Sequence, residues 1–173
     1  MFDATPSFSL PRAEALAALI RALAGAPGAA EVARAAAAAL RQAFPRASGI
    51  YLHGLRSGTQ DLHPLMEGPD RLAASPVAGE ALGRTARGQV IQSEALAGSG
   101  SEAAARLIAA PLVHGQRCLG TVALTFAPGD DGSPDDAEWL MLLAQQVTLG
   151  LAHAAAEQRF RTMSEEVEAR AQA

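Results

Sequence analysis

The apolar positions between Leu107 and Phe126 predict a β-hairpin. Two apolar runs, Leu107–Val113 and Leu119–Phe126, flank a short polar connection that contains Gly115. Runs of this length around a tight, glycine-containing turn are typical of paired antiparallel strands. Neither run alternates apolar with polar residues, so both faces of the strand pair should be buried. The pattern therefore predicts that the hairpin lies at the centre of a sheet covered on both sides.

The segments around this hairpin predict helices and a second hairpin. Apolar residues at three- and four-residue spacing, proline starts and glycine stops indicate helices at about residues 11–24, 29–44 and 76–87, and from 135 or 136 to the C-terminus. Short strands are expected at Gly49–Leu55 and Asp61–Met66, and Gln89–Gln92 reads as a short extended piece. The segment Ala95–Glu102, rich in Gly and Ser, is expected to be mobile.

The order of these elements predicts an α+β fold in one domain. An antiparallel sheet should lie between the N- and C-terminal helices on one face and a helix-and-loop roof on the other. Residues 1–10 are expected to form a flexible N-terminus, and residues 11–160 a single domain. Residues 161–173 are expected to extend the last helix.

Composition narrows the possible chemistry and partners. The 173 residues carry a net charge of −4, which favours neither nucleic acid nor an anionic membrane as partner. All 14 basic residues are Arg, and Lys and Asn are absent. The single Cys118 excludes an intrachain disulfide and a multi-cysteine zinc site, and it fits a cytoplasmic location. Neither a signal peptide nor a membrane-spanning helix is expected, because no apolar run reaches about 18 residues without a charge.

Three segments resemble the GAF domain family over about residues 13–160. The segment at residues 83–91, GRTARGQVI, is similar to the end of that family's middle helix. Residues 110–124, APLVHGQRCLGTVAL, resemble its central hairpin, and Phe126 with residues 136–144, DAEWLMLLA, resembles its final helix. PAS domains share a related layout but usually lack the N-terminal helix pair and the closing helix.

The resemblance implies both a fold and a class of function. It implies an antiparallel sheet of the six-stranded type, with the first two helices and the last on one face. The middle helix and loops would roof the other face, which often encloses a small-molecule pocket. GAF domains mostly act as sensors or dimerising modules upstream of effectors such as kinases, cyclases or transcription regulators. We therefore expect a non-catalytic sensory module that signals to an effector domain or protein, although a shared fold does not fix function.

Several activities of the resembled family are disfavoured by missing residues. The cyclic-nucleotide signature Asn-Lys-x-Phe-Asp-Glu cannot occur in a chain without Asn and Lys. Bilin attachment needs a thiol near the pocket, and Ser93–Ala105 contains neither Cys nor His. A free methionine-sulfoxide reductase needs a nucleophilic and a resolving cysteine. The sequence has only one cysteine, so this enzyme is a disfavoured alternative and no cofactor is expected.

The remaining polar candidates are interpreted as structural. The four histidines show no metal-ligand spacing and are expected to be surface or partly buried residues: His53, His63, His114 and His153. Cys118 is expected to be a small apolar filler rather than a redox sensor. The acidic cluster around Asp130 and Asp136 does not reproduce an EF-hand loop, so we expect a solvated loop that leads into the last helix. No metal site is predicted.

One face of the central hairpin is the candidate ligand site. Strand alternation groups Thr121, Ala123 and Thr125 on one face and the bulkier Val122, Leu124 and Phe126 on the other. The small residues leave room for a neutral ligand oriented by hydroxyls. The predicted ligand-binding residues are Met66, Leu82, Thr85, Val90, Leu107, Ala109, Thr121, Ala123 and Thr125. In the alternative reading, Met66, Leu82 and Val90 fill this space, and the chain is a purely structural dimerisation domain.

The last helix carries a second apolar stripe that predicts a partner. One stripe, from Leu140 to Ala154, should lie on the chain's own domain. The other has alternating four- and three-residue spacing, as in a coiled coil, and His153 and Ala156 weaken it. Its predicted dimer-interface residues are Leu149, Ala156, Phe160, Met163 and Val167. The simplest partner is the same helix of a second copy; a frayed tail, or a helix that continues into an output domain, are the alternatives.

Overall fold

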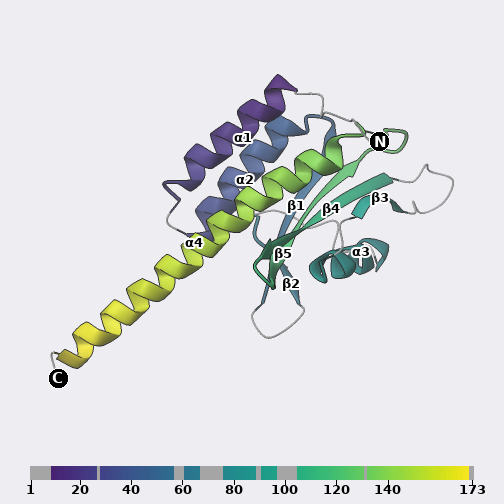
Figure 1. Ribbon diagram of the computed structural model, residues 1–173. Coiled ribbons are helices and arrows are strands. Elements are labelled where there is room, and N and C mark those ends of the chain that lie inside the picture. Colours follow the sequence, from purple (N-terminus) through teal and green to yellow (C-terminus); the bar gives the residue numbers. More distant parts are fainter. Residues whose placement is uncertain are drawn as a thin grey trace.

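Four helices and a five-stranded sheet make up the part of the chain described by the computed structural model (Figure 1). The described residues are 9–26, 28–56, 61–66, 76–88, 91–96, 105–130 and 132–171. Neighbouring strands are antiparallel, in the order β2-β1-β5-β4-β3. The elements are α1 (Leu10–Leu23), α2 (Ala29–Ala43), β1 (Ala47–Leu55), β2 (Leu62–Pro64), α3 (Pro76–Ala86), β3 (Ile91–Leu96), β4 (Ala105–His114), β5 (Arg117–Phe126) and α4 (Asp136–Ala171).

The predicted central hairpin is confirmed as β4 and β5. A two-residue turn joins the strands, and Gly115 adopts a φ of +62°, a conformation that side chains other than glycine rarely take. Strand β5 is the middle strand of the sheet and pairs with β1 on one edge and β4 on the other. Both faces of β5 are therefore available for packing, as the unbroken apolar run predicted.

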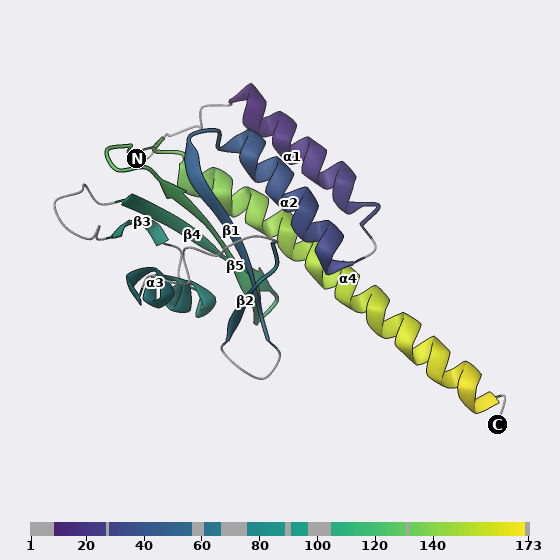
Figure 2. The same ribbon diagram turned by 180° about the vertical axis from the view of Figure 1, so that it is seen from behind.

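Helices α1, α2 and α4 cover one face of the sheet and α3 covers the other (Figures 1 and 2). The larger core lies on the three-helix side, where bulky strand residues meet apolar helix residues. The strand residues include Ile108, Leu112, Val122, Leu124 and Phe126, and the helix residues include Leu19, Val32, Leu40, Leu140, Leu143 and Val147. The prediction that Val122, Leu124 and Phe126 face the helical layer is confirmed.

Helix α3 packs on the opposite face through small residues. Its buried side chains recur at three- and four-residue spacing: Ala78, Ala81, Leu82 and Thr85. The apolar members of this stripe form a compact cluster with Leu107, Ala109 and Ala123 of the strands. Alanines on both surfaces allow the helix to lie close to the sheet, and the second cluster is correspondingly smaller than the first.

Two strand predictions are corrected. Strand β2 is only three residues long, because the chain after Pro64 turns toward the three-helix side, where Leu65 and Met66 pack. Of the extended piece predicted at Gln89–Gln92, Ile91 and Gln92 belong to β3, Ile91–Leu96, whose backbone pairs with β4, and residues 89 and 90 lie outside the described residues. That pairing requires no apolar pattern, and it includes Ala95 and Leu96, which were expected to be mobile. The described sheet thus has five strands, where the resemblance implied the six-stranded type.

Helix α4 spans the domain and continues past it, as predicted. It begins at Asp136, its first half is buried against α2 and β4, and Ala154 is its last buried residue. The remaining turns project away from the sheet and the other helices (Figures 1 and 2). By length and composition α4 could cross a membrane, but a core helix meets the same criterion, so this is weak evidence. Of the predicted flexible segment 1–10, only residues 9 and 10 are described, and Leu10 already belongs to α1.

Candidate functional site

Seven of the nine predicted ligand-binding residues lie on the α3 side of the sheet and are buried. Leu82 and Thr85 come from α3, Leu107 and Ala109 from β4, and Thr121, Ala123 and Thr125 from β5. The cross-strand register pairs Leu107 with Thr125 and Ala109 with Ala123, which brings them onto one face. The sequence pattern therefore predicted correctly that these residues share one face of the sheet. Val90 lies outside the described residues.

The sequence-based prediction put Met66 on the wrong side of the sheet. It packs with the three-helix core, and with Leu65 it lines a cavity of about 180 Å³ along α2. The prediction had Met66 at the end of a strand over Asp61–Met66. Because β2 ends at Pro64, the alternation no longer determines where Met66 points.

One hydroxyl on the α3 side lacks a hydrogen-bond partner among the described residues. Thr85 Oγ1 donates to the Ala81 carbonyl at 2.9 Å, and Thr125 Oγ1 lies 3.3 Å from Ser48 Oγ. Thr121 Oγ1, by contrast, is fully buried and no described group hydrogen-bonds to it. A buried polar atom without a partner costs about 1–3 kcal/mol, so such atoms usually have a protein, water or ligand partner.

The described residues form no group of three His, Cys, Asp or Glu side chains that could hold a metal ion. Cys118 is a partly buried free thiol whose Sγ donates to the Gly120 carbonyl at 3.1 Å. His114 and His153 are exposed and His63 is half-buried, as expected. His53 corrects the prediction, since only 3% of it is exposed. It sits opposite Thr121 in the β1–β5 register, at the middle of the sheet.

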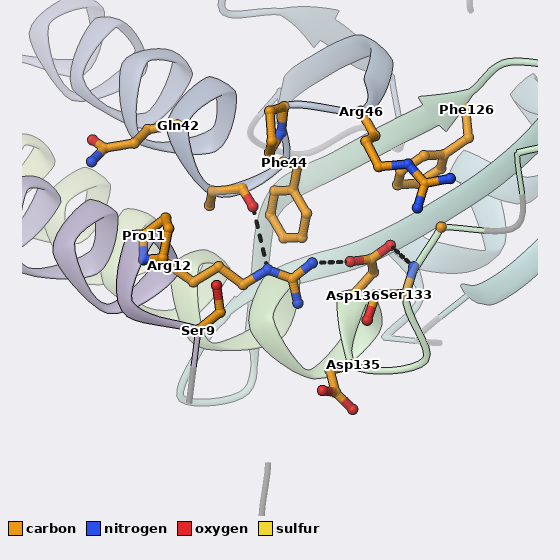
Figure 3. A pocket seen from close by; sticks show the side chains of 13 residues that line it. Ser9, Pro11, Arg12, Gln42, Phe44, Arg46, Phe126, Ser133, Asp135 and Asp136 are labelled. Atoms are coloured by element: carbon orange, nitrogen blue, oxygen red, sulfur yellow. Dashed lines mark hydrogen bonds and ion pairs between the residues drawn. The ribbon is translucent and has the colours of Figure 1, made fainter. Parts of the chain in front are cut away.

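A buried ion pair ties α1 to the start of α4 (Figure 3). The Arg12 guanidinium pairs with Asp136 Oδ1, donates from Nε to the Ala43 carbonyl at 3.3 Å, and lies 5.2 Å from the Phe44 ring centroid. Asp136 also accepts from the Ser133 amide at 2.7 Å. These groups line a cavity of about 270 Å³. The expected solvated acidic loop is therefore wrong for Asp136, which is buried because Arg12 reaches it from the other end of the chain.

The predicted dimer stripe is exposed along α4. Leu149 is 55% exposed, Phe160 72%, Met163 66% and Val167 64%, and Ala156 is exposed between them. The other stripe, which includes Leu140 and Leu143, is buried against the domain as predicted. The exposed and the buried apolar stripes thus lie on different faces of α4, as their spacing predicted.

Comparison with known proteins identifies the fold. No family model matches the sequence, and no curated protein matches it. The structure is similar to the crystal structure of the GAF domain from Acinetobacter phosphoenolpyruvate-protein phosphotransferase, with a TM-score of 0.59 and 15% identity. The match covers 86% of this chain and 96% of that chain. With its antiparallel sheet between helices, this chain has the α+β fold of a GAF domain.

Proposed function

We propose that this chain is a non-catalytic sensory or regulatory module that dimerises through α4 and signals through that helix to an effector. The observation that carries this proposal is the row of exposed apolar side chains on α4, which continues after the helix has left the domain. A protein surface in contact with water rarely keeps a continuous row of apolar side chains uncovered. A GAF fold, typically a regulatory module, is consistent with this role.

A second copy of the chain is the simplest partner for this row. With alternating four- and three-residue spacing, each apolar side chain of one helix can pack into a space between side chains of an identical helix along their length. Closed two-fold dimers are the commonest assembly and use the same patch on both copies. In this proposal, relative movement of the two helices passes the state of the domain to the effector.

Light scattering on the full chain tests the dimer. The wild type should have twice the chain mass of 17.7 kDa at roughly 100 µM, and the double variant Phe160→Glu, Met163→Glu should have the single mass. Four buried carboxylates in one interface would repel and remain unsolvated. The control is Gln158→Glu, Thr162→Glu, which adds the same charge on exposed positions of α4 outside the stripe and should leave the dimer intact. A wild type of single mass, or a double variant of unchanged mass, contradicts the proposal.

We further propose that the sensed molecule is a small neutral ligand bound on the α3 side of the sheet. The support is Thr121 Oγ1, a buried hydroxyl whose hydrogen bond a ligand would complete. The predicted ligand-binding residues on this side are uncharged: Leu82, Thr85, Leu107, Ala109, Thr121, Ala123 and Thr125. A neutral molecule avoids the cost of burying an uncompensated charge there.

The purely structural dimerisation domain is the alternative, and the packing under α3 favours it. Leu82 is only 3% exposed and, with Ala78 and Ala81, packs against the strands. In this case Thr121 Oγ1 would be a stability defect without a functional partner. The enzyme alternative is not proposed, because the chain has a single cysteine.

Thermal-shift screening with nucleosides, neutral sugars and amides separates the two readings. If a ligand binds, some compound raises the melting temperature of the wild type, and Thr121→Val weakens that compound at least fivefold. Thr148→Val is the matched control, since this buried hydroxyl is already bonded within α4 on the other side of the sheet and its loss should leave affinity unchanged. If no compound changes the melting temperature of the wild type and Thr121→Val raises the free energy of unfolding by about 1 kcal/mol, the structural alternative is supported.

A further inference from the structure

The largest of the three cavities described in this structure lies at the base of the projecting part of α4. Its volume is about 420 Å³, within the range of small-molecule sites. Its walls come from the β1–β2 hairpin, the β4–β5 turn, α4 and the first residue of α2. It lies on the three-helix side of the sheet and shares no residue with the predicted ligand face under α3.

Among the described residues that line this cavity, every ionisable side chain is a base. His63, His114, Arg117 and Arg159 line it, and no described Asp or Glu does, although the chain has 18 acidic residues and a net charge of −4. Within the described part of the chain, neither Arg117 nor Arg159 forms an ion pair or a side-chain hydrogen bond. The basic groups of this cavity thus differ from Arg12 and Arg46, which Asp136 and Asp130 neutralise.

The cavity has a polar rim and an apolar floor. Arg117, Arg159 and His114 are exposed, whereas Leu151 is only 9% exposed and Leu65 and Leu119 are half-buried. On α4 the apolar lining continues in small side chains, the half-buried Ala152 and the exposed Ala155, which take up little of the space.

A half-buried histidine forms part of the wall. The His63 ring packs over Gly54, where an added Cβ would lie 2.8 Å from Cε1 of the ring. Nδ1 of His63 is shielded from solvent and has no hydrogen-bond partner among the described residues.

We infer that this cavity binds an amphipathic organic acid, with its carboxylate at the Arg117–Arg159 rim and its apolar part on the leucine and alanine floor. Arginine pairs with carboxylates through charge-assisted hydrogen bonds, and unpaired guanidinium groups at a rim supply them without first breaking another ion pair. Burial of the apolar part away from water supplies further affinity. The inference does not depend on the neutral ligand proposed above, whereas the cavity shares Ala156 with the proposed dimer stripe, so the dimer is measured alongside binding.

Isothermal titration of the full chain with sodium decanoate, below its micelle concentration, tests the inference. Wild type should bind decanoate, and the variant Arg117→Glu, Arg159→Glu should bind it at least tenfold more weakly. The matched control is Arg21→Glu, Arg170→Glu, which makes the same charge change at exposed positions that do not line the cavity and should bind like wild type. Ala155→Trp, which fills the floor and keeps both arginines, should also weaken binding at least tenfold.

Two further probes test the apolar part and the anionic group of the ligand one at a time. The neutral 1-decanol and inorganic phosphate should each bind at least tenfold more weakly than decanoate, because each has only half of the required chemistry. The inference is overturned if decanoate does not bind at millimolar concentration, if the arginine variant or Ala155→Trp binds it like wild type, or if either half-probe binds equally well. Light scattering of the same samples reports the dimer separately, so failure of one proposal is distinguishable from failure of the other.

Discussion

At the scale of single residues, Arg12 connects parts of the chain that lie far apart in the sequence. It joins α1 to the end of α2 through the Ala43 carbonyl and the Phe44 ring, and to the start of α4 through Asp136. The side chains of Arg12 and Asp136 are 14% and 3% exposed. Removing one partner of a buried ion pair leaves the other charge uncompensated, which costs far more than the loss of a surface pair.

We expect Arg12→Ala to lower the free energy of unfolding by about 3 kcal/mol, measured by urea denaturation. The control is Arg46→Ala, which removes an exposed pair with Asp130 and should cost less than about 1 kcal/mol. Similar losses for the two variants would show that the Arg12 pair is no more than a surface contact.

At the scale of elements, close backbone approach in the middle of the sheet depends on Gly120. A Cβ built at this position would overlap the backbone carbonyl oxygen of His53 on the neighbouring strand β1. Backbone cannot move aside as the end of a flexible side chain can, so β1 and β5 could not keep their register. Gly79 in α3 is the opposite case, because nothing lies within 4 Å of its added Cβ.

Gly120→Ala should therefore destabilise the protein by more than about 2 kcal/mol, and Gly79→Ala should stabilise it by about 0.5–1 kcal/mol. Thermal and urea unfolding measure both changes, and amide exchange in β1 shows whether the strand pairing is the part lost. A Gly120→Ala protein of wild-type stability would show that the β1–β5 approach is looser than described.

At the scale of the whole molecule, the sheet separates two cores of unequal size. The three-helix side buries residues from six elements, whereas the buried cluster on the α3 side consists of four alanines with Leu82 and Leu107. Regions with little buried apolar surface open first in the native state. The α3 side is also where a ligand is proposed, so its lower stability would let ligand binding change the order of α3.

Native-state hydrogen exchange should show amides of α3 opening at a free energy at least about 2 kcal/mol below that of β5 and the first half of α4. The comparison lies within one sample, so the amides of β5 serve as the internal reference. Equal protection of α3 and β5 would mean that the two cores unfold together.

Much of this architecture was predictable because it depends on local periodicity. Alternation along β5 placed Thr121 and Val122 on opposite faces, and the two stripes of α4 were separated correctly. Of the candidate ligand face, the strand residues were predictable for the same reason. Met66 was not, because its position follows from where β2 ends and not from any repeat.

The sequence by itself determined which residues of the central hairpin face each side of the sheet, where the helices begin and end, and which face of α4 lacks a cover. Each of these follows from the fixed period of a strand or a helix. Only the tertiary structure decided that β3 pairs with β4, that Asp136 is buried by Arg12, and that bases from two hairpins and α4 meet around one cavity. These contacts join residues that lie far apart in the chain, up to 124 positions for Arg12 and Asp136, and no local period relates residues at that separation.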